Sequence, residues 1–217
     1  MRIGGLKKIT GILLAFGLAL IAVAPTHAQF ETKPTPLWEG LEKSEEDKAN
    51  DQNFIKQALA LSNGDRQAAV IEAVQLGWQQ IGQGQPNDAI RRFNQAWLIN
   101  PDFPDIYWGL GVATHIRGDE TDDVVRWFEE AFKGLRNNPN FLSDRGRVLE
   151  ERKLPERARY WFQAALRIDP NNVPAHVGMS RVAKALGDKA LEKTHLDQLK
   201  LIAPDLVLDD KETEKTE

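Results

Sequence analysis

Residues 107–131 read YWGLGVATHIRGDETDDVVRWFEEA, and the features of this stretch return along the chain at a nearly fixed interval. A small residue comes first, then an aromatic residue or leucine, then an alanine or leucine, with gaps of 34 or 35 residues within each series. The three series are Gly77, Gly111, Gly146 and Ser180; Phe93, Phe128, Phe162 and Leu196; and Ala96, Ala131, Ala165 and Leu199. Three series in one phase indicate a stacked array, in which each unit buries its apolar face against its neighbours.

Each unit reads as two helices joined by a short polar turn. In the first unit the turn at residues 82–86 is followed by Ala89, Phe93 and Ala96, at spacings of four and three. Those spacings place the three side chains on one face of a helix. Pro101 then ends the helix, because proline lacks an N–H and disfavours the α conformation in the residue before it. This is a pattern of packing and not of catalysis.

The pattern resembles the tetratricopeptide repeat family, whose 34-residue consensus runs W-x2-L-G-x2-Y, then Ala, Phe and Pro. The resemblance covers about residues 70–205, and the second unit matches best. The fourth unit lacks the aromatic residue and both alanines, as terminal repeats often do. Another class of helical repeat of similar length is disfavoured, because prolines close the units. The residues of the second unit that match are Tyr107, Trp108, Gly109, Leu110, Gly111, Gly118, Asp119, Val124, Phe128 and Ala131.

The resemblance implies an all-α fold, a right-handed superhelical solenoid of helix-turn-helix repeats with an N-terminal capping helix. An apolar face predicts that capping helix over residues 47–62, and residues 47–69 include the lead-in to the first repeat. Residues 29–46 are predicted to be a linker or disordered arm. Within this arm, Leu37-Trp38 is more readily a contact with the chain's own surface than a partner motif. Four repeats are predicted over 70–208, at 70–103, 104–138, 139–172 and 173–208, followed by a disordered tail at 209–217.

The first 28 residues have the three parts of a secretory signal peptide. Basic residues occupy positions 2, 7 and 8, an uncharged run extends from 9 to 24, and Ala28 ends a group suited to a signal peptidase. We therefore predict cleavage after Ala28 and a periplasmic or secreted protein. The alternative is a retained membrane anchor, although the uncharged run is shorter than the roughly 20 residues that a spanning helix needs.

Composition limits the classes of partner. The chain has no cysteine, so it carries neither a disulfide framework nor a thiolate nucleophile. Removing residues 1–28, which hold three basic and no acidic side chains, changes the formal net charge from −4 to −7. Nucleic acid is therefore not an expected partner, because its binding needs a basic face. Membrane contact is expected only if the N-terminal segment is retained.

The motifs of catalytic, cofactor and metal sites are not matched. Gly109-Leu110-Gly111 lacks the third glycine of a dinucleotide loop, and no strand is expected before it. His115, His176 and His195 lie in different repeats, without the helical spacing of zinc ligands. We predict that the protein is not an enzyme and has no cofactor and no metal site.

The predicted binding surface is the concave groove that first helices line in this family. An aromatic end and a charged end would suit an extended or helical peptide. Two points stay open. Trp78 could instead pack under the capping helix. Arg147 and Arg181 could either bind an acidic partner or form ion pairs within the chain, with Asp144 and Glu150. The groove residues are Trp78, Trp108, Val112, His115, Asp144, Arg147, Glu150, Arg181 and Lys184.

The sequence thus predicts an exported scaffold that binds a protein or peptide partner, as an adaptor in cell-envelope assembly or export. Two alternatives remain. One is a self-associating structural scaffold, in which the end face of the degraded fourth unit would be the surface of a homodimer. The other is an accessory non-catalytic subunit of an envelope enzyme complex.

Overall fold

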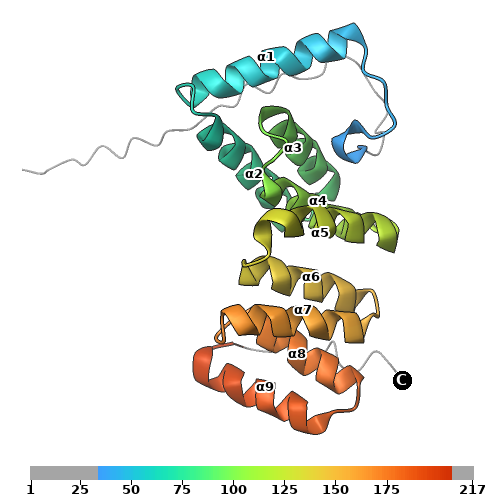
Figure 1. The fold of residues 1–217 in the computed structure, drawn as a ribbon, viewed down its shortest axis with the longest axis vertical. Helices are drawn as coiled ribbons and strands as arrows, with labels where there is room; N and C mark the ends of the chain where they lie inside the picture. Colours follow the sequence, from blue (N-terminus) through green and yellow to red (C-terminus); the bar gives the residue numbers. More distant parts are fainter. Residues whose placement is uncertain (1–33, 207–217) are drawn as a thin grey trace, which may run out of the picture. The chain divides into compact units, whose positions relative to one another are not determined.

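The computed structural model describes residues 34–206, so the predicted signal peptide and the predicted tail lie outside the described residues. Within this range every regular element is helical, as Figure 1 shows. None of these helices is both long enough and apolar enough to cross a membrane. The elements are η1 (Pro36–Trp38), α1 (Glu45–Leu61), α2 (Arg66–Gly82), α3 (Pro86–Ile99), α4 (Pro104–Arg117), α5 (Thr121–Leu135), α6 (Pro139–Glu151), α7 (Pro155–Ile168), α8 (Val173–Ala185) and α9 (Lys189–Ile202).

Helices α2 to α9 form four pairs, and the two helices of each pair pack closely on one another. The prediction of an all-α array of helix pairs is confirmed. The first pair spans residues 66–99, so it begins four residues before the predicted first repeat. The other three pairs lie within the ranges predicted for repeats two to four.

Local sequence explains where the helices begin and end. Pro86, Pro104, Pro139 and Pro155 open α3, α4, α6 and α7, at positions where the missing N–H has no helical partner to lose. Gly118 ends α4 in the left-handed conformation, with φ of 86°, which glycine adopts at little cost. Prolines thus mark the starts of four helices, and a left-handed glycine marks the end of α4.

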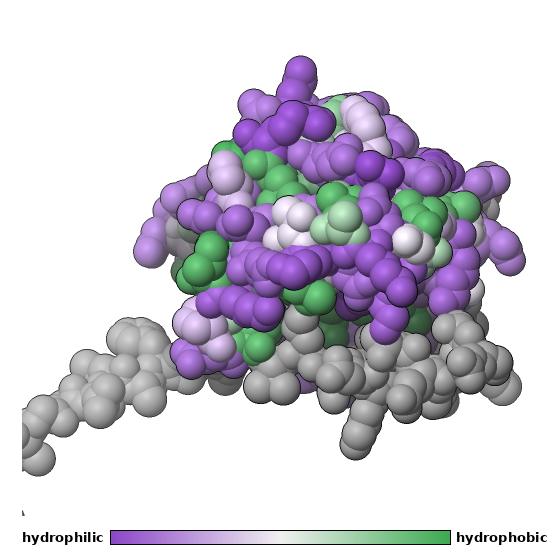
Figure 2. Space-filling view, turned by 90° about the horizontal axis from the view of Figure 1, so that it is seen from below, coloured by the Kyte–Doolittle hydropathy of each residue, from purple (hydrophilic) through white to green (hydrophobic). Residues whose placement is uncertain are grey.

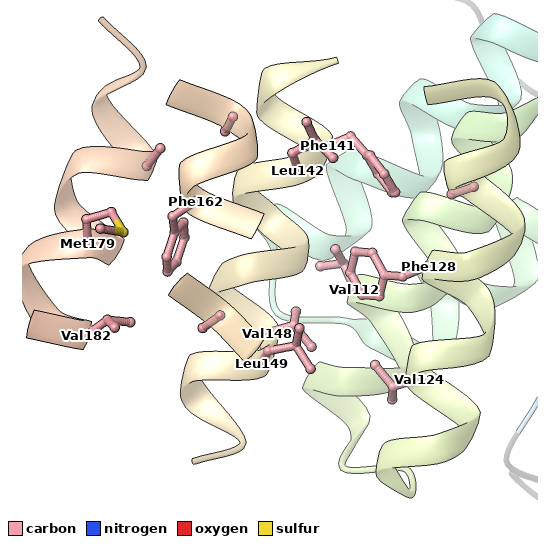
Figure 3. Close-up of a cluster of buried hydrophobic side chains, with 14 residues drawn as sticks. Val112, Val124, Phe128, Phe141, Leu142, Val148, Leu149, Phe162, Met179 and Val182 are labelled. Carbon is pink, nitrogen blue, oxygen red and sulfur yellow. The ribbon is translucent and has the colours of Figure 1, made fainter. Parts of the chain in front are cut away.

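The repeated phenylalanines form the centre of the core. Phe93, Phe128 and Phe162 are fully buried, as expected of the aromatic residue in a pattern of packing, and Figure 3 shows the last two within one cluster. Each ring fills space left free by glycine on a first helix. A Cβ atom at Gly77 would lie 2.5 Å from the Phe93 ring, and a Cβ atom at Gly109 of the next unit would overlap that ring. The small residues of the repeat are thus needed where the rings meet the backbones.

The helix backbones stand further apart at the junction between the second and third units than at the other two junctions. Helix α3 packs closely on α4, and α7 on α8, whereas α5 and α6 meet chiefly through side chains such as Phe128 and Phe141, whose ring centroids are 6.0 Å apart. Three residues, 136–138, separate α5 from α6. The looser junction also has room for a side chain at Asp144, whose repeat position is held by Gly109 and Gly178 in the neighbouring units.

Arg145 is buried at this junction, at the repeat position that Leu110 and Met179 hold in the adjacent units. Its side chain pairs with Glu129, and its guanidinium carbon lies 3.7 Å from the centroid of the Trp161 ring. Its Nη1 atom has no hydrogen-bond partner. Burial lowers the pKa of Arg145, while the charge of Glu129 opposes that shift. The junction therefore holds a buried charge where the other units hold an apolar side chain.

The N-terminal part of the described chain packs against the first unit. No residue of α1 is buried, but Phe54 and Leu59 contact the core of the first helix pair. Before α1, the backbone N–H of Leu37 donates to Asn94 Oδ1 over 2.8 Å, and the Trp38 ring lies 6.4 Å from that of Trp97. The interpretation of Leu37-Trp38 as a contact with the chain's own surface is confirmed. This part of the predicted arm therefore has a defined position on α3, held by polar and aromatic contacts.

The fourth unit contains a buried pair of histidines between α8 and α9. His176 Nδ1 lies 2.8 Å from His195 Nδ1, and His176 Nε2 lies 2.9 Å from the Pro170 carbonyl oxygen. Because a carbonyl oxygen only accepts, His176 carries its proton on Nε2, and its Nδ1 accepts from His195. Burial, and then the charge of His176, lower the pKa of His195.

This pair predicts that acid destabilises the fourth unit. A histidine whose folded-state pKa is lowered binds fewer protons when folded, so stability is complete above the unfolded pKa of about 6.5 and falls as the pH drops below it. The melting temperature should decrease between pH 7 and pH 5, and His195→Leu should show a smaller decrease, as measured by circular dichroism. An equal decrease in both proteins would assign the acid sensitivity to other groups.

Candidate functional site

The first helices of the four units lie side by side. Helix α2 contacts α4, α4 contacts α6, and α6 contacts α8, whereas neighbouring second helices make no comparable contact. The first helices are therefore on the inner side of the stack, where the candidate residues were predicted. We call the part formed by Trp78, Trp108, His115, Asp144, Arg147, Glu150, Arg181 and Lys184 the first-helix surface.

Two half-buried tryptophans form the aromatic end of this surface. Trp78 on α2 and Trp108 on α4 meet edge to face, with ring centroids 4.9 Å apart. Trp78 also lies 5.9 Å from Phe93, and Trp108 lies 5.9 Å from Phe141. Among the described residues, the ring contacts of Trp78 are with α3 and α4 and not with α1. Both indoles rest on the core and keep part of their surface exposed.

Val112 is not part of this surface, and its prediction as a groove residue was wrong. It is 2% exposed and belongs to the hydrophobic core cluster drawn in Figure 3. Val112 shares its repeat position with Trp78, Arg147 and Arg181, at intervals of 34 or 35 residues. Valine is the shortest of these four side chains, and Val112 is the one of the four that is buried in the core.

Asp144 links the aromatic end to the charged end. The indole N–H of Trp108 donates to Asp144 Oδ2 over 3.0 Å, and Arg147 donates to Asp144 Oδ1 over 3.3 Å. Burial raises the pKa of Asp144, while the charge of Arg147 and the bond from Trp108 act in the opposite direction. The carboxylate thus joins α4 to α6 and holds the Trp108 ring in place.

His115 and Glu151 make a second link between α4 and α6. His115 Nε2 lies 2.5 Å from Glu151 Oε2, and Arg152 donates from Nε to His115 Nδ1 over 3.1 Å. Because Arg152 can only donate, His115 accepts at Nδ1 and carries its proton on Nε2. Burial alone would raise the pKa of Glu151, but the His115 hydrogen bond and the Arg147 charge lower it to about 2.

The two arginines of the surface have carboxylate partners within the protein. Arg147 donates to Glu151 over 3.0 Å in addition to Asp144, and Arg181 donates to Glu150 over 2.7 Å. Of the two explanations for this arginine pair, the structure shows pairing. Lys184 is exposed and makes no ion pair with any residue between 34 and 206. An acidic partner is therefore not needed to balance Arg147 and Arg181.

Sequence reasoning missed Glu151 and Arg152, which complete this network. Arg152 also donates to Thr121 Oγ1 over 2.8 Å and to the Asp119 carbonyl over 2.7 Å. The repeat pattern contained an indication of Arg152, because Arg117 occupies the same repeat position 35 residues earlier. Arg117 likewise ties the end of its helix to another segment, donating to the Pro34 carbonyl over 2.6 Å.

These polar links cross the junction at which the backbones of α5 and α6 stand further apart. Trp108 to Asp144, His115 to Glu151 and Arg152 to Thr121 all connect the second unit to the third. The network therefore fixes the relative position of two units and also fixes the side chains of the surface. Within residues 34–206, no group of three or more histidines and carboxylates is placed to hold a metal ion.

Comparisons with known proteins agree with this geometry. A family model described as tetratricopeptide repeat matches residues 74–140 and 133–173. A crystal structure of MamA superposes with a TM-score of 0.55 at 16% identity, covering 76% of this chain and 98% of that one. A second MamA structure gives a TM-score of 0.53 at 16% identity, covering 79% and 92%. No curated protein sequence matches significantly.

At such low identity the MamA structures show the fold alone. The same fold is visible in the four helix pairs and in the phenylalanine rings that fill the space beside glycine. Together with the family model, these features show that residues 74–173 consist of tetratricopeptide repeats and that the described chain has the tetratricopeptide repeat fold.

Proposed function

We propose that this protein is an exported scaffold that binds a protein or peptide partner on its first-helix surface, as an adaptor in cell-envelope assembly or export. The observation that carries the proposal is the half-exposed pair of Trp78 and Trp108 beside a hydrogen-bonded cluster of charges. Partly exposed tryptophans with fixed orientation are the residues that most often dominate protein interfaces.

The internal ion pairs restrict the chemistry of the partner. Because Arg147 and Arg181 are already paired, a strongly acidic ligand would have to compete with Asp144, Glu150 and Glu151. A segment with an apolar side chain for the tryptophans and neutral polar groups for the network fits better. Lys184, exposed at the far end, would offer one charge to a carboxylate of the partner.

The export part of the proposal rests on the N-terminal sequence. Three basic residues, an uncharged run and Ala28 match the requirements of a signal peptide. A mature net charge of −7 without cysteines is compatible with an extracytoplasmic compartment of either redox state.

Self-association is the second candidate function. The end of the unit formed by α8 and α9 exposes Leu201, at 75%, together with Leu186 and Leu206. Figure 2 shows this end as largely hydrophilic, with hydrophobic patches that are separated from one another. Dimer interfaces are usually centred on a continuous apolar area, so this end supports the second candidate less well than the first-helix surface supports the first.

The test is site-specific photocrosslinking in the native envelope. A benzoylphenylalanine side chain would replace Trp78 or Lys184 on the first-helix surface, and Gln198 on the exposed side of α9 as the matched control. We expect a discrete crosslinked product from the first two positions and none from the control. Sequencing the recovered protein should give Gln29 as the first residue.

The outcomes separate the proposals. Equal crosslinking at all three positions, or none at Trp78 and Lys184, would remove the first-helix surface as the binding site. A product of twice the chain mass, containing this protein alone, would favour self-association. Recovery of intact Met1 in the membrane fraction would show that the N-terminal segment is an anchor.

A further inference from the structure

A second surface lies on the other side of the stack, between the second helices α5 and α7. It is an open cleft of about 200 Å³, and Leu142 near the start of α6 is part of its lining. Its apolar lining includes exposed atoms of Tyr160 and Ile168, whose residues are 57% and 44% exposed. The cleft is lined chiefly by Phe132, Leu142, Tyr160, Trp161, Arg136 and Arg167.

At the equivalent place one repeat earlier, the side chains are different. Within the second unit, Tyr107 of α4 stacks on Trp127 of α5 with centroids 6.4 Å apart, and its hydroxyl donates to the Pro101 carbonyl, which follows α3, over 2.7 Å. Leu142 and Trp161 hold the equivalent positions one repeat later. Leucine lacks the ring and the hydroxyl. Trp161 instead lies against the buried Arg145 and meets the Phe132 ring of α5 edge to face, and the cleft lies beside these side chains.

Positive charge surrounds this apolar cleft. Arg136 and Arg167 stand at its edge, and within residues 34–206 neither has a carboxylate partner. Arg145 adds a third guanidinium behind the Trp161 ring, with one nitrogen that lacks a hydrogen bond, although Glu129 pairs with another nitrogen. A low-dielectric cleft lined by charges of one sign concentrates ligands of the opposite sign, even in a chain whose net charge is −4.

We propose that this cleft between α5 and α7 binds an acidic segment of a partner protein that carries one aromatic or aliphatic anchor residue. The anchor would rest on Phe132, Leu142 and Trp161, where burial of apolar area stabilises the complex. Carboxylates on both sides of the anchor would pair with Arg136 and Arg167, whose planar guanidinium groups favour bidentate contacts. This site is separate from the first-helix surface and does not depend on it.

Fluorescence anisotropy with a labelled peptide tests the proposal. The probe is fluorescein-labelled Asp-Glu-Phe-Leu-Glu-Asp, compared with a peptide that has alanine in place of Phe and Leu, and with one that has lysine in place of the four acids. We expect saturable binding of the first peptide with a dissociation constant below about 1 mM, and weaker binding of the other two by about tenfold or more.

Two matched variants separate the cleft from general charge. Arg136→Glu with Arg167→Glu should weaken binding about tenfold or more, because two charge-assisted contacts are lost. Lys56→Glu with Lys189→Glu changes the net charge equally on exposed positions of α1 and α9 and should leave binding unchanged. Lys184→Glu, on the first-helix surface, should also leave it unchanged. Circular dichroism melting would confirm that all variants are folded.

Several results would overturn the proposal. One is the absence of saturable binding of the first peptide to the folded protein. Another is an equal loss of binding in the Lys56 and Lys189 variant, which would show attraction to net charge alone. Equal binding of the alanine peptide would show that the apolar lining takes no part. Loss of binding in Lys184→Glu alone would place the peptide on the first-helix surface instead.

Discussion

Truncation of Phe93 to alanine is expected to lower the free energy of unfolding by about 3–5 kcal/mol, the usual cost of removing a fully buried ring. The ring fills the space between Gly77 of its own unit and Gly109 of the next, so its removal leaves a cavity at the contact of two repeats. Since domains are stable by only about 5–15 kcal/mol, the variant should be much closer to unfolding. Urea unfolding followed by circular dichroism measures the loss.

A double-mutant cycle with Gly109 supplies the control. Gly109→Ala alone should cost about 1–3 kcal/mol, because the added Cβ would overlap the Phe93 ring. In the Phe93→Ala background that cost should vanish, since the methyl group enters the vacated space and alanine favours the helix by about 1 kcal/mol. Strictly additive losses would show that the two positions are not in contact. Gly178 and Phe162 repeat the same geometry and allow a second, independent cycle.

The repeat spacing made this part of the fold predictable. Phe93 and Phe162 recur at one position because each ring passes between two backbones, and glycine both in its own unit and in the next leaves room for it. Such a requirement appears directly in the sequence as residues of fixed size at fixed intervals. The number of helix pairs and the burial of the phenylalanines follow from it, as does their order along the chain.

The candidate site was less predictable, because helical spacing gives the face of a residue but not what covers it. Val112 lies at the same repeat position as Arg147, yet it is buried in the hydrophobic core cluster. Glu151 and Arg152 lie at the end of α6, and their partners His115 and Thr121 belong to another unit. Contacts between units depend on how far apart the helices stand. The loose junction of α5 and α6 has no repeated sequence signal.

Replacement of Arg145 by methionine is expected to stabilise the protein by about 1–4 kcal/mol, the gain seen when buried ionic groups are exchanged for apolar ones of similar volume. Methionine is present at the same repeat position in the fourth unit, as Met179, where it is buried in the core. At Arg145 the folded state leaves Nη1 without a hydrogen bond and pairs the charge with a carboxylate, Glu129, that is itself largely exposed. The desolvation of the guanidinium is therefore only partly offset.

The opposite result would identify what the arginine contributes. If Arg145→Met lowers the free energy of unfolding by more than about 1 kcal/mol, the stacking of the guanidinium on Trp161 outweighs its desolvation. Glu129→Gln serves as the control, because it keeps the arginine and removes its charge partner, and it should destabilise the protein.

The same methionine variant should bind the acidic peptide more weakly, since one positive charge behind Trp161 is lost. Greater stability together with weaker binding would mean that Arg145 lowers the stability of the junction and raises the affinity of the cleft for an acidic peptide.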